Sequence, residues 1–96
     1  MIFKIFSSYD EKTEAFLPPF YLPTIEAAKR HFGDAVNNPE TSIHLHPGDY
    51  SLFSLGTFDD ETGEIIYNKK ILGNGLDFKK QQESGQDPGL QAVQNN

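Results

Sequence analysis

The chain has 96 residues and carries 8 Lys and Arg against 14 Asp and Glu, a formal net charge of −6 at pH 7. An acidic protein is poorly suited to the DNA binding that clustered Lys and Arg drive by releasing counterions. Cysteine is absent, which excludes disulfides, thiolate catalysis and zinc sites that use sulfur. No apolar run approaches the roughly 18 residues of a membrane span, so we expect one small soluble domain in a reducing cytoplasm, without a membrane partner.

Two β-strands are predicted in the first quarter of the chain. Residues 1–8 carry apolar side chains on both faces of an extended segment, which is typical of a central strand. Residues 14–17 are expected to pair back on this strand as a hairpin. Pro18 and Pro19 should end that pairing because proline has no backbone N–H, and residues 18–23 are predicted to form a polyproline-like crossover.

One helix is predicted to begin after Thr24, whose hydroxyl can cap the backbone N–H groups of the first turn. Residues 37–39, Asn-Asn-Pro, are expected to end it. Between these limits four apolar residues recur at helical spacing and should pack on a sheet, namely Ile25, Ala28, Phe32 and Val36.

The second half of the chain predicts a β-hairpin. Residues 50–58 and 64–67 are rich in strand-forming residues, and the acidic turn between them ends in Gly63. Residues 70–78 are predicted to form a further strand, interrupted by Gly73 and Gly75. The resulting prediction is an α+β domain over residues 1–78 in the order β-β-α-β-β. It has an antiparallel sheet of three to five strands, one helix packed on it, and a disordered tail over residues 79–96.

Two groups of side chains could hold a metal ion. On a strand, His44 and His46 would share one face, and Asp49 or His31 could complete a metal site. Two histidines alone are weak evidence for such a site, and ordinary surface or loop histidines are the favoured interpretation. The acidic residues of the hairpin turn lack the ligand pattern of a calcium loop and are predicted to be a solvated turn: Asp59, Asp60, Glu61 and Glu64. We therefore predict no metal and no cofactor.

The sequence contains no recognisable catalytic constellation. Its Ser and Thr residues do not occur in a nucleophile-elbow motif or beside an identifiable base, and paired carboxylates cannot be inferred from neighbours in a turn. We therefore expect no enzymatic activity.

The most suggestive binding pattern combines basic and aromatic residues near the end of the predicted domain. Lysines and a tyrosine interleave there and could contact single-stranded DNA, the tyrosine by stacking and the lysines by neutralising phosphates. The alternative is that Tyr67 and Phe78 belong to the core and that the lysines keep strand ends soluble. The candidate nucleic-acid-binding residues are Tyr67, Lys69, Lys70, Lys79 and Lys80.

Four blocks of sequence together resemble a viral family. They are residues 1–10 (MIFKIFSSYD), 16–20 (FLPPF), 46–56 (HPGDYSLFSLG) and 78–80 (FKK). As a set they resemble the small nonstructural protein of microviruses, the single-stranded DNA phages, and in particular of the gokushovirus branch. Gly48 departs from the family pattern, in which an acidic residue is expected before Asp49.

The resemblance implies a protein of the infected bacterium that is absent from the mature virion and acts in DNA replication. It would bind single-stranded DNA, or switch synthesis to single-stranded progeny DNA coupled to packaging. The acidic charge keeps an alternative open, an adapter or inhibitor that binds a replication, procapsid or host protein without touching DNA. A homo-oligomer is plausible for either function, because a small domain gains by pairing its strand edges.

Overall fold

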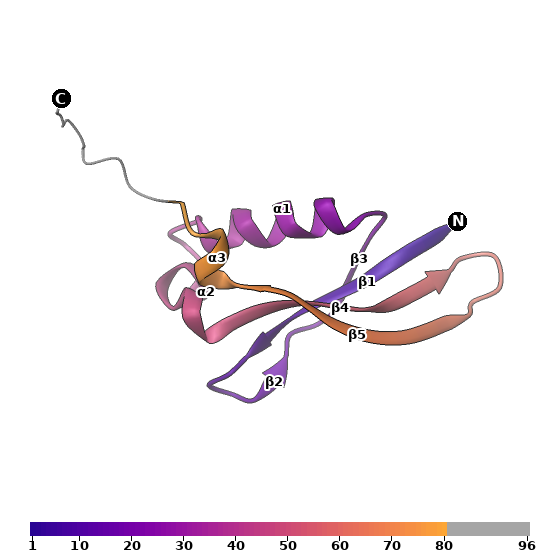
Figure 1. Cartoon of the computed structure of the whole chain (residues 1–96), viewed down its shortest axis with the longest axis horizontal. Helices are drawn as coiled ribbons and strands as arrows, with labels where there is room; N and C mark the ends of the chain where they lie inside the picture. The colour runs from indigo at the N-terminus through magenta and orange to yellow at the C-terminus, as the bar shows by residue number, and fades with distance from the viewer. Residues whose placement is uncertain (81–96) are drawn as a thin grey trace, which may run out of the picture.

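One antiparallel sheet organises residues 1–80, the part of the chain that this computed structural model describes (Figure 1). The order across the sheet is β2-β1-β4-β5, and β3 also pairs with β1. The strands are β1 (Ile2–Asp10), β2 (Ala15–Phe16), β3 (Phe20–Leu22), β4 (Tyr50–Asp59) and β5 (Ile65–Asn74). The helices are α1 (Ile25–Val36), α2 (Ser42–Leu45) and α3 (Gly75–Phe78), with a 3-10 turn η1 (Pro47–Asp49). The predicted α+β class is confirmed.

The prolines explain why one edge of the sheet is broken. Strand β4 pairs along the whole of one edge of β1. The other edge of β1 is shared by two short strands, β2 and β3. Pro18 and Pro19 lie between β2 and β3 and cannot donate backbone hydrogen bonds. The predicted crossover over residues 18–23 therefore contains a short edge strand, β3.

The main core lies between the sheet and α1, which runs along one side of it (Figure 1). Phe6 from β1 and Leu52 from β4 are buried there against the helix. Three residues of the predicted apolar stripe, Ala28, Phe32 and Val36, are buried, and Ile25 packs beside them. The predicted cap is also present, because the backbone N–H of Ala27 donates to the Thr24 hydroxyl at 3.0 Å.

The prediction of a separate strand over residues 70–78 is wrong. Residues 70–74 continue β5, which makes the β4–β5 hairpin much longer than expected, and α3 follows. A capping box at Asn74 turns the chain into α3: its side chain accepts from the Leu76 N–H, and its own N–H donates to Asp77 at 2.9 Å. Single-turn helices such as α2 and α3 leave too short a periodic pattern to be read from the sequence.

The chain after α3 begins by contacting α1. Asn37 caps α1, and its side chain donates to the Phe78 carbonyl and accepts from the backbone N–H of Lys80 at 2.9 Å. Of the predicted disordered tail, residues 81–96 lie outside the described residues. Within residues 1–80, no helix is both long and apolar enough to span a membrane.

Candidate nucleic-acid interface

The sheet has a second face, which points away from α1. Side chains alternate between the two faces of a strand, so Ser7 and Phe53 point away from the helix because their neighbours Phe6 and Leu52 point toward it. Ser7 and Phe53 are register partners on β1 and β4, which places them side by side on this second face.

Three strands, β1, β2 and β4, bring a cluster of aromatic rings together on this face, and β5 adds a lysine. The ring centroids of Tyr9 and Phe16 are 4.9 Å apart, and those of Phe16 and Phe53 are 5.3 Å apart. The ammonium group of Lys69 on β5 lies 5.9 Å from the centroid of Phe16 and 5.9 Å from that of Phe53. These are cation–π distances, so a positive charge is held against an aromatic surface.

The same face continues toward the hairpin turn. Tyr21 of β3 stacks on Phe58 of β4 with their centroids 6.0 Å apart. Tyr67 of β5 pairs with Gly56 of β4, which in turn pairs with Ile5 of β1. Tyr67 is 70% exposed. We call this surface the aromatic face and define it by Tyr9, Phe16, Tyr21, Phe53, Phe58, Tyr67 and Lys69.

The aromatic face also buries the middle of the sheet. Ile5 and Ser7 lie beneath it and are buried, although none of the helices in residues 1–80 covers this side. The Ser7 hydroxyl donates to the Leu17 carbonyl at 2.5 Å. The face is therefore an ordered platform of rings rather than a set of loose surface side chains. An ordered platform of this kind can stack unpaired bases, while a lysine beside it neutralises a phosphate.

The structure brings only part of the predicted site together. Tyr67 and Lys69 lie on the aromatic face, at alternate positions of β5. Lys70 points to the other side of the sheet, where it lines a pocket of about 240 Å³ with Lys4 and Thr57. Lys79 and Lys80 follow α3, at the end of the molecule near Asn37. Sequence reasoning missed Tyr9, Phe16 and Phe53, which meet only through the pairing of β1 with β2 and β4.

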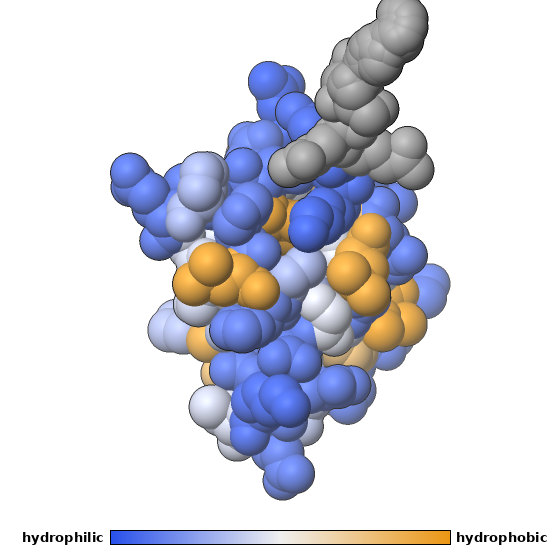
Figure 2. Space-filling view, turned by 90° about the vertical axis from the view of Figure 1, so that its left-hand side faces the viewer, coloured by the Kyte–Doolittle hydropathy of each residue, from blue (hydrophilic) through white to orange (hydrophobic). Residues whose placement is uncertain are grey.

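The end of the molecule that carries α2 and α3 differs from the aromatic face. Figure 2 shows this end largely covered by hydrophilic residues, with separate hydrophobic patches between them. Leu45 of α2 and Leu76 of α3 are both strongly exposed. These two leucines are single exposed apolar side chains, whereas the aromatic face carries a cluster of rings.

His44 and His46 do not lie on a strand, so the arrangement considered for a metal site does not form. His44 belongs to α2 and His46 caps it, because the Thr41 hydroxyl accepts from the His44 N–H and starts a helical turn. The Nδ1 atom of His44 lies 2.9 Å from the Val36 carbonyl oxygen, which gives the ring a local role in holding α2 on α1. Among residues 1–80 no three His, Asp or Glu side chains are placed to hold a metal ion.

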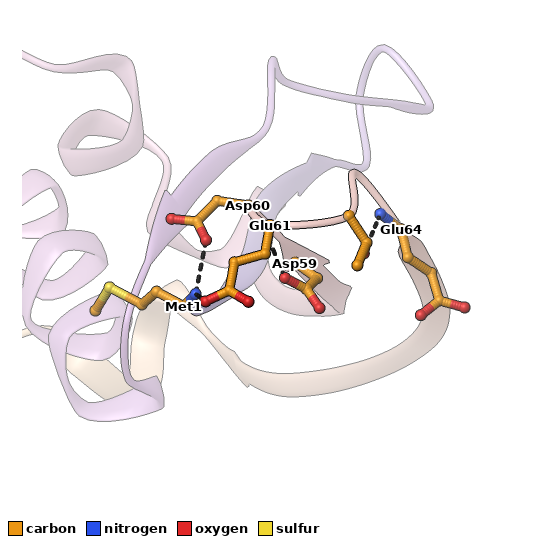
Figure 3. A network of polar contacts seen from close by, with 6 residues as sticks. Met1, Asp59, Asp60, Glu61 and Glu64 are labelled. Atoms are coloured by element: carbon orange, nitrogen blue, oxygen red, sulfur yellow. Dashed lines mark hydrogen bonds and ion pairs between the residues drawn. The ribbon is translucent and has the colours of Figure 1, made fainter.

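The acidic hairpin turn binds the amino terminus of the chain. The Met1 ammonium group donates to Asp60 at 2.6 Å and lies 3.6 Å from Glu61 (Figure 3). The hydrogen bond to Asp60 raises the pKa of the Met1 amino group above its ordinary value of 8.0. Asp60 and Glu61 therefore contribute to holding the start of β1 against the hairpin turn, while both remain exposed.

One protein-family model matches the chain, over residues 3–78, and the family is described as Phage ORF5 protein. No curated protein and no solved structure matches the chain. The matched range contains every residue of the aromatic face.

Proposed function

Because this chain belongs to the Phage ORF5 protein family, we propose that it is a nonenzymatic phage protein that acts in viral genome replication and packaging by binding single-stranded DNA. The resemblance of its sequence blocks to the small nonstructural protein of microviruses supports this role. In this proposal the protein works in the cytoplasm of the infected bacterium and is not part of the mature virion.

The aromatic face is the observation that carries the proposal. Tyr9, Phe16 and Phe53 form a platform of rings with Lys69 against it, and Tyr67 extends the platform along β5. Every base has a π-face, so such a platform binds single strands with little sequence preference, and a duplex would have to unstack before its bases could reach it.

The net charge of −6 fits binding that depends mainly on stacking. Only Lys69 among the residues that define the aromatic face is positively charged, so few phosphates would be neutralised there. For single strands the logarithm of the affinity falls by about 0.7 per neutralised phosphate for each tenfold rise in salt. We therefore expect a shallow salt dependence, in contrast to the steep one of a basic DNA-binding protein.

Fluorescence anisotropy of a labelled oligo(dT) at two salt concentrations tests the proposal. Tyr67→Ala removes an exposed ring and should weaken binding by about 1–3 kcal/mol, which is the value of one stacked base. Lys69→Gln should weaken binding and make its salt dependence shallower, since it removes a phosphate contact. Both side chains lie on the surface of the edge strand β5, so the fold should be retained.

The matched controls are Tyr67→Phe and Lys29→Gln. Tyr67→Phe keeps the ring, and Lys29 lies on α1 away from the aromatic face, so both variants should bind like the original chain. A labelled duplex of the same length should bind more weakly. Equal affinity of all variants, or tighter binding to duplex than to single strands, would refute the proposed site.

A second candidate function is the protein adapter or inhibitor, and the hairpin turn favours it. Asp60, Glu61 and Glu64 are exposed at the end of the β4–β5 hairpin, which projects away from α2 and α3 (Figure 1). Such an acidic end could occupy a basic site on a replication, procapsid or host protein. This function predicts no binding to oligo(dT), together with binding to one purified phage or host protein that Glu61→Gln and Glu64→Gln weaken.

A further inference from the structure

Strand β5 leaves one long edge of the sheet open. It is the last strand in the order β2-β1-β4-β5 and, among residues 1–80, pairs only with β4. It is ten residues long, contains no proline, and is exposed from residue 65 to residue 71. Ile65, Ile66 and Ile71 are each more than half exposed. A long strand edge with unpaired backbone groups and exposed apolar side chains is a template for pairing with another strand.

The backbone of β5 shows which groups are available at this edge. The Glu64 carbonyl accepts from the Asp59 N–H at 3.0 Å, and the Ile66 carbonyl faces Gly56, so both residues direct their backbone toward β4. Backbone direction alternates along an antiparallel strand, so Tyr67 directs its N–H and C=O to the open edge. Two copies of β5 can therefore exchange a pair of hydrogen bonds at Tyr67.

The charges around Tyr67 are self-complementary. Glu64 precedes it by three residues and Lys70 follows it by three. In an antiparallel pair centred on Tyr67, Glu64 of each copy faces Lys70 of the other. Within one strand the two are about 20 Å apart, too far to pair, and neither forms an ion pair with the described residues. The Glu64 carboxylate points away from the Met1 amino group (Figure 3).

We propose that a second copy of this chain pairs antiparallel with the β5 edge, with Tyr67 at the two-fold axis and Glu64 opposite Lys70 of the second copy. The symmetric contact is closed, because the same edge is used by both copies. It joins the two sheets into one and brings Tyr67 and Lys69 of both copies onto one continuous face. The association does not depend on DNA binding and is tested without nucleic acid.

Sedimentation equilibrium of the full chain and of two charge-reversal variants tests this pairing. The original chain should dimerise. Glu64→Lys and Lys70→Glu each place like charges opposite each other twice, so each variant alone should dimerise about tenfold more weakly or worse. Mixing the two variants restores both Glu–Lys pairs, and the mixture should regain the dimer affinity of the original chain.

Glu11→Lys and Lys12→Glu are the matched controls. They make the same charge changes at exposed positions of the turn between β1 and β2, and they should leave dimerisation unchanged. Circular dichroism checks that every variant keeps the fold. A monomeric original chain, variants that dimerise like the original, or a mixture that stays as weak as its components would each overturn the proposal.

Discussion

The side chain of Asn74 joins three elements, so replacing it tests how the β5 end of the sheet is held. Its amide nitrogen donates to the carbonyls of Gly48 and Tyr50 at 3.0 and 3.2 Å and to the Ser51 hydroxyl at 3.1 Å. Its oxygen accepts from the Leu76 N–H at 3.0 Å and caps α3. One residue therefore ties β5 to η1, β4 and α3.

The expected cost of Asn74→Ala follows from these bonds. An amide has two hydrogens, so the three acceptors share two donor bonds, and the cap adds one accepted bond. At about 0.5–1.5 kcal/mol each, three partly buried bonds of this kind sum to about 1.5–4.5 kcal/mol, with a central value of about 3 kcal/mol. A small domain has about 5–15 kcal/mol of unfolding free energy in total, so Asn74→Ala should remove a large part of it.

Urea denaturation followed by far-ultraviolet circular dichroism measures this loss. With a typical slope of about 1 kcal/mol per molar urea for a small domain, the midpoint should fall by about 3 M. Asn68→Ala removes an exposed Asn of the same strand and should stay within about 0.5 kcal/mol of the original chain. Asn74→Asp keeps the cap but sets a carboxylate against two carbonyl oxygens, so it should destabilise the protein at neutral pH as well. If Asn74→Ala cost no more than Asn68→Ala, the proposed role of Asn74 would be wrong.

Three further outcomes are expected. Phe32→Ala empties a position that is 1% exposed in the core and should cost about 3–5 kcal/mol in urea denaturation; a loss below about 1 kcal/mol would contradict the assigned core. Gly56→Ala should cost at least about 2 kcal/mol in the same assay, because φ is +149° and a Cβ there would overlap the Ile66 carbonyl; an unchanged midpoint would contradict this packing. Folding raises the pKa of the Met1 amino group. The stabilisation that the charged amino group provides is therefore complete below pH 8.0 and is lost as the pH rises through the raised pKa. The stability difference between the original chain and Asp60→Asn should therefore shrink at alkaline pH. A difference that grows there would contradict a stabilising ion pair between the Met1 ammonium group and Asp60.

Local signals in the sequence were sufficient for the fold class and for α1. Thr24 and the stripe that includes Phe32 specify a capped amphipathic helix through contacts within one or two turns. The full length of β5 could not be predicted, because residues 64–67 and 70–78 were assigned to separate strands and Gly73 and Gly75 suggested an interruption. Tertiary pairing with β4 carries the strand through that segment to Asn74.

The candidate site was less predictable than the fold. Tyr67 and Lys69 were found because they are close in sequence and alternate on one strand. Phe16 and Phe53 were not, since they lie on different strands and are joined only by the long-range register of the sheet. Lys70 was grouped with Lys69 as a basic pair, although strand alternation places adjacent residues on opposite faces.

The most direct test of the proposed function is nuclear magnetic resonance of the labelled protein during titration with unlabelled oligo(dT). Stacking on the aromatic face predicts that ring signals of Tyr9, Phe16 and Phe53 and the side chain of Lys69 shift first and furthest. Signals of the opposite face, such as those of Arg30 on α1, should stay unchanged. Shifts confined to α1, or an unchanged spectrum at saturating oligonucleotide, would contradict the aromatic face as a binding site for single-stranded DNA.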